Sequence, residues 1–300
     1  MTAQPSELGI KQELSLGEVI SKTFQIYRRD FTKYFILFAV VEVIIGIVTA
    51  LAHQAFVLPA LPSNPTPQQV SSWLPGFFGA FVLLIASTFL VTVVFFPIAQ
   101  GSAIKMASER IEKGQAELGV SIRFAAGKLI WIWILTIVVG ILVFLGLIAL
   151  IVPGIILAIM FALAFPVLLI ENKGIGGSMG RSRELVGHRW LKTFATYLVL
   201  GIIVAIAATI VSTISSPFGV ASPVVSGILS AFYQPLFPIL LCVYYYSNLA
   251  RISPHPEVQM TGAPAGAAVQ AGVKYCPNCG TQLSSTAIFC TNCGARVDMV

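Results

Sequence analysis

The sequence predicts an all-α polytopic membrane protein with a small β-hairpin domain at its C-terminal end, and three observations support this fold class. Hydrophobic residues make up 57% of the 300 residues and charged residues only 10%, against roughly a quarter charged in soluble proteins. The apolar residues gather in runs of about 20, the length of helix that crosses a hydrocarbon core of ~30 Å. After residue 250 these runs end, and polar residues with paired cysteines replace them.

Six apolar segments are the expected transmembrane helices. They cover residues 34–56, 77–99, 129–150, 154–170, 193–214 and 224–247. Residues 129–170 contain no charged residue, but as one helix at ~1.5 Å per residue they would be about twice as long as the bilayer core is thick. Val152-Pro153-Gly154 interrupts this stretch, because proline cannot continue a helix and glycine tolerates a tight reversal. We therefore expect a helical hairpin there.

The positions of the 18 Lys and Arg residues orient these spans. All of them lie before the first span, between spans two and three, between spans four and five, or after the sixth. The alternate segments 57–76, 151–153 and 215–223 contain none. Because cytoplasmic loops are enriched in Lys and Arg, we expect a multi-pass protein of the cell membrane with both termini in the cytoplasm. The N-terminus lacks the pattern of a cleavable signal, so the first span is expected to direct insertion.

Two cytoplasmic segments have the pattern of amphipathic helices lying in the membrane interface. Ser15-Leu-Gly-Glu18 has the spacing of a capping box. The apolar residues that follow recur at helical spacing: Leu16, Ile20, Phe24, Tyr27 and Phe31. A shorter helix of this kind is expected at Arg181–Trp190, and these basic segments also fit the positive-inside signal alone. The candidate contacts with anionic lipid headgroups are Arg28, Arg29, Arg181, Arg183 and Arg189.

Aromatic residues flank the same basic segments, where amphipathic rings are expected at a membrane interface. They are Tyr34, Trp131, Trp133, Trp190, Tyr244, Tyr245 and Tyr246.

Three stretches occur in an order that resembles a known membrane domain. They are LSLGEVISKTFQIYRRDF, IVPGIILAIMFALAFPVLLIEN and GIGGSMGRSRELVGHRWLKTF. Together they resemble the membrane domain attached to some glycerophosphoryl diester phosphodiesterases, and its stand-alone relatives, over residues 14–250. The resemblance implies a multi-helix integral membrane domain. The soluble barrel that carries catalysis in the fused enzymes has no counterpart in this sequence.

The C-terminal part predicts a tethered metal site. Residues 251–274 are rich in Ala, Gly and Pro and predict a flexible linker. The expected organisation is therefore a cytoplasmic N-terminus with an amphipathic helix at 1–33, a transmembrane domain at 34–250, this linker, and a small domain at 275–297. That domain contains two Cys-x-x-Cys knuckles, each followed by glycine, and its candidate metal ligands are Cys276, Cys279, Cys290 and Cys293.

Four thiolates arranged in two knuckles predict a zinc ribbon that holds one Zn²⁺ ion. A redox dithiol pair, structural disulfides and an iron site of the rubredoxin type are the alternatives, and a reducing cytoplasm disfavours the disulfides. Because protein sulfurs fill all four coordination positions, the site is expected to be structural and to supply the folding energy of the module. The fifth cysteine, Cys242, lies in an apolar run and is expected to be a small packing residue.

Glu42 is the only acidic residue within a predicted span and is a possible intramembrane functional residue. No Asp, Glu, Lys or Arg occurs in the other five spans, so a charge relay has no evident second member. A hydrogen-bonded or protonated structural role competes with a role in transport. GIGGSMGRS lacks the Gly-Lys-Ser/Thr of a phosphate-binding loop, and no serine nucleophile motif occurs, so we expect no enzymatic activity.

The sequence thus predicts a non-enzymatic membrane protein that presents a cytoplasmic zinc ribbon for protein interaction or regulation. A transporter or channel-like protein with a regulatory ribbon is the second hypothesis. A membrane accessory in lipid or glycerophosphodiester metabolism is the third, and rests on the resemblance alone. The expected partners are the bilayer with its anionic headgroups and a cytoplasmic protein, while the small net charge of the tail disfavours nucleic acid.

Overall fold

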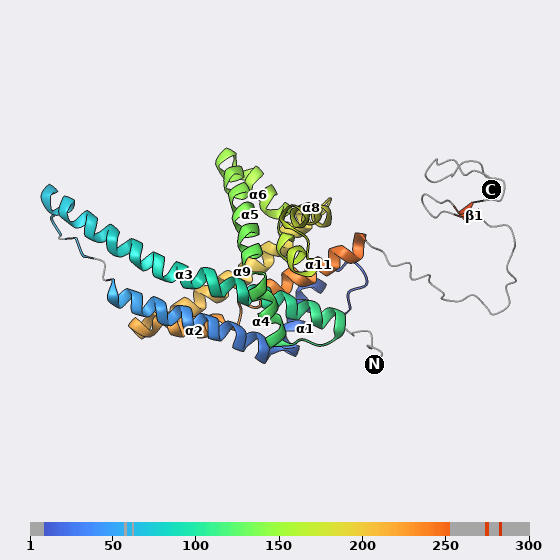
Figure 1. The fold of residues 1–300 in the computed structure, drawn as a ribbon, viewed down its shortest axis with the longest axis horizontal. Coiled ribbons are helices and arrows are strands. Elements are labelled where there is room, and N and C mark those ends of the chain that lie inside the picture. The colour runs from blue at the N-terminus through green and yellow to red at the C-terminus, as the bar shows by residue number, and fades with distance from the viewer. Residues whose placement is uncertain (1–8, 57–58, 62, 253–273, 276–281, 284–300) are drawn as a thin grey trace. The chain divides into compact units, whose positions relative to one another are not determined.

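The structure is a computed structural model that describes residues 9–56, 59–61, 63–252, 274–275 and 282–283. The chain divides into two compact units, Met1–His255 and Pro256–Val300. In the described part of the first unit, every regular element is a helix (Figure 1). These are α1 Leu16–Arg29, α2 Phe31–Ala55, α3 Pro67–Lys113, α4 Leu118–Gly127, α5 Leu129–Ala149, α6 Ile151–Met160, α7 Ala164–Ile170, α8 Ile175–Val186, α9 Trp190–Ser215, the 3₁₀ helix η1 Ser216–Ala221, α10 Ser222–Ser230 and α11 Leu236–Ile252.

By length and composition, five helical stretches among the described residues could cross a membrane. They are Phe31–Ala55, Pro67–Lys113, Leu129–Ala149, Ile151–Ile170 and Trp190–Ser230. The chain is therefore a helical protein with several membrane-capable helices, as the composition predicted. The predicted count of six spans is not confirmed, because the last predicted span is interrupted.

The first helix begins where its capping box predicted. The Ser15 hydroxyl accepts a hydrogen bond from the Glu18 backbone N–H, and the Glu18 carboxylate accepts one from the Ser15 N–H at 2.6 Å. Buried residues of α1, including Val19 and Ile26, belong to the protein core. Tyr27 donates a hydrogen bond to the Phe232 carbonyl at 2.7 Å. This bond joins α1 to the turn before α11, and α1 also contacts α11 itself. The interfacial position of this helix stays a prediction.

Helix α3 is much longer than the predicted span 77–99. It contains 47 residues, and at ~1.5 Å per residue it is more than twice as long as a bilayer core is thick. Its start lies inside the segment 57–76, which the sequence assigned to a loop. Thr66 and Gln69 form a reciprocal capping box there, and Pro67 occupies the first turn, where it needs no backbone donor. Helix α3 ends at Gly114, whose φ of 68° is readily adopted by glycine.

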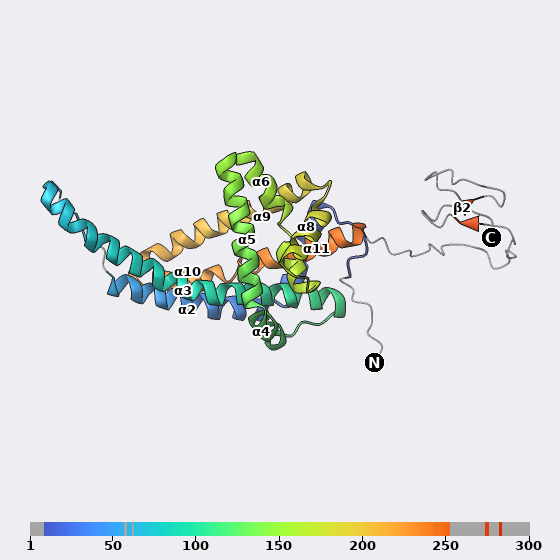
Figure 2. The ribbon, with the colours of Figure 1, turned by 45° about the horizontal axis from the view of Figure 1, so that its top comes forward.

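The hairpin expected near Val152-Pro153-Gly154 is present as α5 and α6, which run side by side in Figures 1 and 2. The break lies at Leu150, whose φ of −165° and ψ of 147° are extended. Pro153 therefore sits in the first turn of α6, where a missing N–H costs no helical hydrogen bond. Gly146 and Gly154 let the two helices approach closely. A Cβ atom added to Gly154 would lie 2.7 Å from the Leu147 backbone nitrogen.

Gly154→Ala is expected to destabilise the helical unit by about 1–3 kcal/mol, because the added methyl group would force α5 and α6 apart. Gly140→Ala is the matched control, since a Cβ atom there would meet nothing within 4 Å. The measurement is the melting temperature of the purified chain in detergent. Equal melting temperatures for the two variants would contradict the close contact.

The predicted span 224–247 is broken into α10 and α11. Residues 231–235 form turns between them, with hydrogen bonds that reach back three or four residues, such as Tyr233 N–H to the Ser230 carbonyl at 3.0 Å. Pro235 has no N–H to continue the ladder of α10, which explains the break. Helix α10 runs antiparallel to α2. A Cβ at Gly46 would lie 2.8 Å from the Pro223 carbonyl oxygen, and a Cβ at Gly227 would lie 2.8 Å from that of Glu42.

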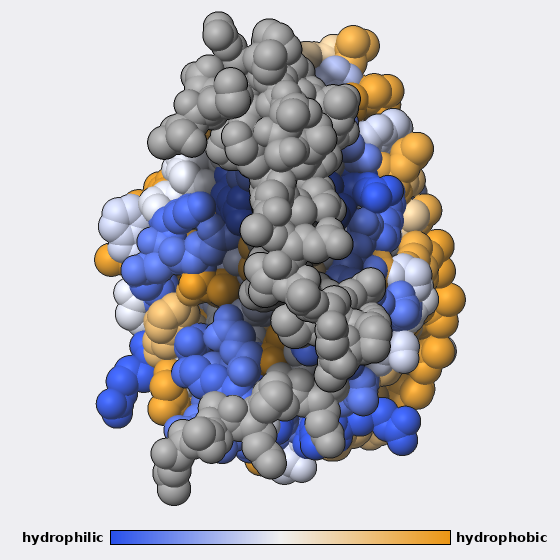
Figure 3. Space-filling model, turned by 90° about the vertical axis from the view of Figure 1, so that its right-hand side faces the viewer, coloured by the Kyte–Doolittle hydropathy of each residue, from blue (hydrophilic) through white to orange (hydrophobic). Residues whose placement is uncertain are grey.

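Charged side chains gather at one end of the helical unit. This end, which we call the charged end, is formed by α1, α4 and α8, the C-terminal ends of α3 and α11, and the first turn of α9. Figure 3 shows the hydrophilic residues on this face of the molecule. The connections at the opposite ends of the long helices, near residues 59–66, 150 and 216–221, contain no Lys or Arg. The folded chain thus separates its basic residues from its apolar helices in the way that the loop pattern predicted.

Candidate functional site

The described part of the predicted zinc ribbon is a short strand pair. Strand β1, Lys274–Tyr275, pairs antiparallel with β2, Gln282–Leu283. The register places Lys274 opposite Leu283 and Tyr275 opposite Gln282. In the sequence, these strands bracket the first Cys-x-x-Cys knuckle. Cys276, Cys279, Cys290 and Cys293 themselves lie outside the described residues, so their roles as metal ligands stay a prediction.

The chemistry of the donor set fits zinc. Four thiols in two knuckles match the soft, tetrahedral coordination that Zn²⁺ takes in structural sites. Within the residues that the structure describes, no group of three or more His, Cys, Asp or Glu side chains could hold a metal ion. Cys242 is fully buried in α11 and lies among core residues, as its packing role predicted. The tail is therefore the strongest candidate metal centre of this chain.

Three consecutive tyrosines of α11 form a polar junction inside the helical unit. Tyr244 exchanges a hydrogen bond with the Thr193 hydroxyl at 2.8 Å, and Tyr245 donates one to the Glu171 carboxylate at 2.9 Å. Tyr246 donates its hydroxyl proton to the Glu112 carboxylate and accepts a hydrogen bond from the Ser108 hydroxyl at 2.8 Å. Successive helical residues point about 100° apart. One turn of α11 is thereby joined to α3, α9 and the end of α7.

The sequence assigned these tyrosines to the membrane interface, and the structure instead buries all three. Tyr244 and Tyr245 are 1% exposed and Tyr246 is 9% exposed. Tyr34 is fully buried as well, while Trp131 and Trp190 remain about half exposed. The physical reason is that each buried hydroxyl of α11 finds a protein partner, so the ring needs no water. The signal in the sequence was the run of three, since a simple interfacial anchor needs no tyrosine on every side of a helix.

Glu171 is the acidic centre of this junction. It follows α7 directly and accepts hydrogen bonds from Lys173 at 2.7 Å, Arg181 at 3.2 Å and Tyr245. Partial burial favours its neutral form, but the hydrogen bonds from these three donors outweigh it and hold the pKa of Glu171 below its ordinary value. Arg181 also pairs with Glu184 at 2.7 Å. Burial disfavours the charged form of Arg181, but its pairs with the two carboxylates outweigh burial and raise its pKa.

The junction is expected to lose stability in acid. Because the folded pKa of Glu171 is depressed, its contribution is fully present above the ordinary glutamate pKa of about 4.3 and is lost as pH falls through the folded value. Glu171→Gln should therefore melt well below the unmodified chain at neutral pH, and this gap should narrow as pH falls through the lowered pKa of Glu171. Glu117→Gln, at the start of α4, is the control. A gap that stays constant with pH would contradict the role of the carboxylate.

The five arginines predicted to contact headgroups are not equivalent in the structure. Arg181 pairs with Glu171 and Glu184, and Arg189 pairs with Glu13 at 3.1 Å. Arg28, Arg29 and Arg183 are exposed. Pairs with Lys192 and Arg189 outweigh burial and lower the pKa of Glu13, so this carboxylate belongs to the charged end as well. Arg181 and Arg189 thus already have carboxylate partners, and headgroup binding stays a prediction for all five.

Glu42 lies in the middle of α2 and is partly buried. Its partner is the side chain of Gln234, which hydrogen-bonds to it from the turn between α10 and α11. The Gln234 side-chain oxygen is buried and has no hydrogen-bond partner among the described residues. Gln234 is neutral, so a pattern of charged residues does not reveal it as the partner of Glu42. The available signal was a glutamine next to Pro235 inside an apolar run.

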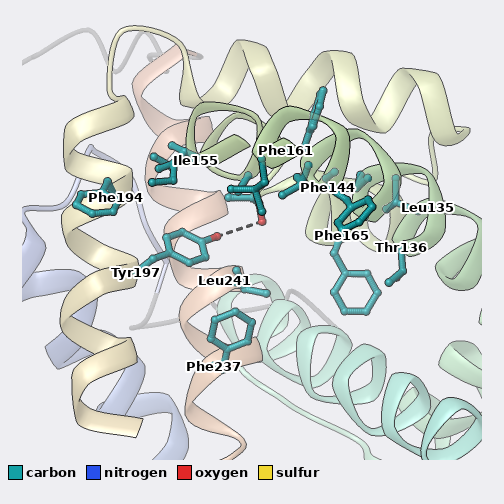
Figure 4. Close-up of a pocket in the computed structure, with 18 residues that line it drawn as sticks. Leu135, Thr136, Phe144, Ile155, Phe161, Phe165, Phe194, Tyr197, Phe237 and Leu241 are labelled. Carbon is teal, nitrogen blue, oxygen red and sulfur yellow. Dashed lines mark hydrogen bonds between the residues drawn. The ribbon is translucent and has the colours of Figure 1, made fainter. Parts of the chain in front are cut away.

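A large apolar cavity lies between α5, α6, the segment 161–165, α9 and α11 (Figure 4). Its volume of about 740 Å³ is within the range of small-molecule sites, roughly 300–1,000 Å³. The lining is mainly aliphatic and aromatic, and Figure 4 shows Phe194 and Tyr197 on one side and Phe144 and Phe165 on the other. The Tyr197 hydroxyl donates a hydrogen bond to the Ala162 carbonyl at 3.1 Å, which removes it as a free polar group.

Comparison with known proteins identifies a domain family only in the C-terminal tail. A zinc-ribbon domain family matches residues 266–297, which include all four candidate cysteines. The search of curated proteins gave no match. The search of solved structures also gave no match. The chain therefore carries a zinc-ribbon domain next to several membrane-capable helices, and the comparisons add no support for the resemblance to the phosphodiesterase-associated membrane domain.

Proposed function

We propose that this chain is a non-enzymatic membrane protein that holds a structural zinc ribbon at the cytoplasmic face, where the ribbon binds a protein partner. The observation that carries the proposal is a zinc-ribbon domain at 266–297 on the same chain as several membrane-capable helices. Zinc ribbons of the Cys₄ type have no open coordination position for a reacting water, so a binding role fits this module better than catalysis.

The orientation follows from the charged end. The basic residues of α1, α4 and α8 lie on the same end of the helical unit as the last residues of α11, from which the tail continues. Since positive residues concentrate on the cytoplasmic side, this end supports a cytoplasmic ribbon. A reducing compartment also keeps the four cysteines available as zinc ligands.

The experiment is affinity capture from cross-linked cells with the full chain as bait. A variant that ends at residue 250 and the variant Cys290→Ser/Cys293→Ser serve as comparisons, with Cys242→Ser as the control that keeps the ribbon. We expect the first two to lose the same set of captured cytoplasmic proteins, because both remove the folded ribbon. A set that is unchanged in the truncated variant would rule out recruitment by the tail.

Transport is the second candidate function, and one contact favours it. Gln234 lies at the break between α10 and α11 and bonds to Glu42, and broken helices form substrate sites in many transporters. Flux of a tested solute into proteoliposomes that depends on Glu42, and survives deletion of the tail, would favour transport over the adaptor role.

A further inference from the structure

A small hollow of about 280 Å³ lies at the turn between α8 and α9, at the charged end. Its rim contains Arg183, His188 and Trp190, and its floor is formed by residues of α6, including Ile159. The walls are held in place. The Ser182 hydroxyl donates to the Met160 carbonyl at 2.8 Å and accepts from the Leu163 N–H at 3.1 Å, which fixes α8 against the end of α6.

The turn that carries the rim is also fixed from α11. Arg251 donates a hydrogen bond to the Leu185 carbonyl at 2.9 Å. His188 has a φ of 60°, a left-handed conformation that a non-glycine residue keeps only where its surroundings stabilise it. The hollow is therefore a built feature of the fold.

Arg183 is the cation of this rim that has no partner in the described part of the chain. Its side chain is exposed, and no hydrogen bond or ion pair of its guanidinium occurs among the described residues. The carboxylates around the turn are already paired: Glu184 binds Arg181 at 2.7 Å, and Glu13 binds Arg189 and Lys192. A rim with an unpaired guanidinium, next to paired carboxylates, is complementary to an anion.

The small hollow adjoins the large apolar cavity. Both are lined by Ile159 of α6, and along α9 the residues Trp190, Phe194 and Tyr197 share one helical face, the first at the small hollow and the others at the large cavity. Along α5 the cavity extends from Leu135 to Leu147, or ~18 Å at the helical rise, slightly more than the ~15 Å of one leaflet of hydrocarbon.

From these two neighbouring hollows we propose that the helical unit binds one anionic glycerophospholipid, with its phosphate at Arg183 and His188 and an acyl chain in the apolar cavity. The occupant follows from the surroundings. An apolar cavity that is open between membrane-spanning helices is surrounded by lipid, so an acyl chain is its expected occupant. Basic pockets at the membrane surface select anionic headgroups. This inference does not depend on the zinc ribbon and goes beyond the proposed recruitment of a protein.

The test is native mass spectrometry of the delipidated full chain in dodecyl maltoside, titrated with phosphatidylglycerol or with phosphatidylcholine of the same acyl chains. We expect one phosphatidylglycerol to bind tighter than phosphatidylcholine. Arg183→Gln should reduce phosphatidylglycerol affinity roughly tenfold, because a charge-assisted contact to phosphate is lost. It should reduce phosphatidylcholine affinity less, because the choline cation of that lipid already offsets the attraction between the phosphate and the arginine. Arg123→Gln is the matched control, since Arg123 is also exposed and without a partner among the described residues but lies on α4, away from both hollows.

A second pair of variants tests the chain-binding part. Gly140 lines the cavity and a Cβ atom there would meet nothing within 4 Å, so Gly140→Trp should fill the cavity and reduce the affinity for both lipids. Gly79→Trp, at an open position on α3, is its control. Retained lipid in Gly140→Trp, or equal losses in the two arginine variants, would overturn the proposal. Displacement of the lipid by inorganic phosphate alone would also overturn it, because that outcome indicates an anion site without a binding site for the acyl chain.

Discussion

Replacing Cys276 and Cys279 by serine is expected to abolish zinc binding by this chain. Two of four thiolates would be lost, and serine hydroxyls do not replace them as ligands at neutral pH. In zinc-finger peptides, binding of the ion supplies about 10–16 kcal/mol, and small metal modules are unfolded without it. We therefore expect the unmodified chain to carry one zinc ion per molecule and the double variant to carry none. In the double variant, the unfolded tail after residue 252 should also be cleaved by proteases.

Elemental analysis of the purified full chain is the measurement, with limited proteolysis as the second readout. Cys242→Ser is the control because Cys242 is buried in α11, and it should retain the ion. Iron in place of zinc would keep the ligand set but change the cofactor. A full complement of metal in the double variant would show that the four cysteines are not the site.

Asp30→Asn is expected to destabilise the helical unit by about 3–5 kcal/mol, the largest effect that we expect of a single substitution in the helices. Asp30 links α1 to α2, and its side chain is 3% exposed. Its carboxylate accepts two hydrogen bonds from Arg110 of α3, one of them from Nε at 2.6 Å. The neutral amide would leave the guanidinium of Arg110, which is 13% exposed, buried without its counter-charge.

Lys113→Gln provides the comparison on the same helix. Lys113 lies 3.8 Å from Glu109 with its side chain 64% exposed, and such exposed pairs contribute at most ~1 kcal/mol. The measurement is thermal unfolding in detergent, and a double-mutant cycle with Arg110→Gln isolates the pair. If Asp30→Asn and Lys113→Gln unfold alike, the Asp30–Arg110 pair does not join these helices.

The features predicted well from the sequence depend on local rules. The capping box at Ser15 and Glu18 fixed the start of α1, and the Val152-Pro153-Gly154 break correctly placed a hairpin within a few residues. The apolar runs indicated membrane-capable helices, and the paired cysteines indicated the zinc-ribbon domain that the family comparison finds. Each of these signals is contained in a short window of sequence.

The features that the sequence did not yield depend on contacts between distant segments. The tyrosines of α11 face helices that are separated from them by many residues, so their burial follows from packing alone. The division of the last span into α10 and α11 was hidden because Pro235 and Pro238 occur in an otherwise continuous apolar run, and proline is tolerated in membrane helices. The cavity between α5 and α9 is lined by residues from several helices, so the pattern of any single helix does not reveal it.

The central claim is that the charged end and the tail that follows it face the cytoplasm. It is tested most directly by labelling intact cells with a membrane-impermeant maleimide after adding one cysteine to the five natural ones, by Asn64→Cys, between α2 and α3, or by Ala268→Cys, ahead of the first cysteine knuckle, with the unmodified chain as the reference. We expect the first variant to be labelled in intact cells and the second only after the membrane is permeabilised. Labelling of Ala268→Cys from outside intact cells would contradict the topology and, with it, a cytoplasmic role for the zinc ribbon.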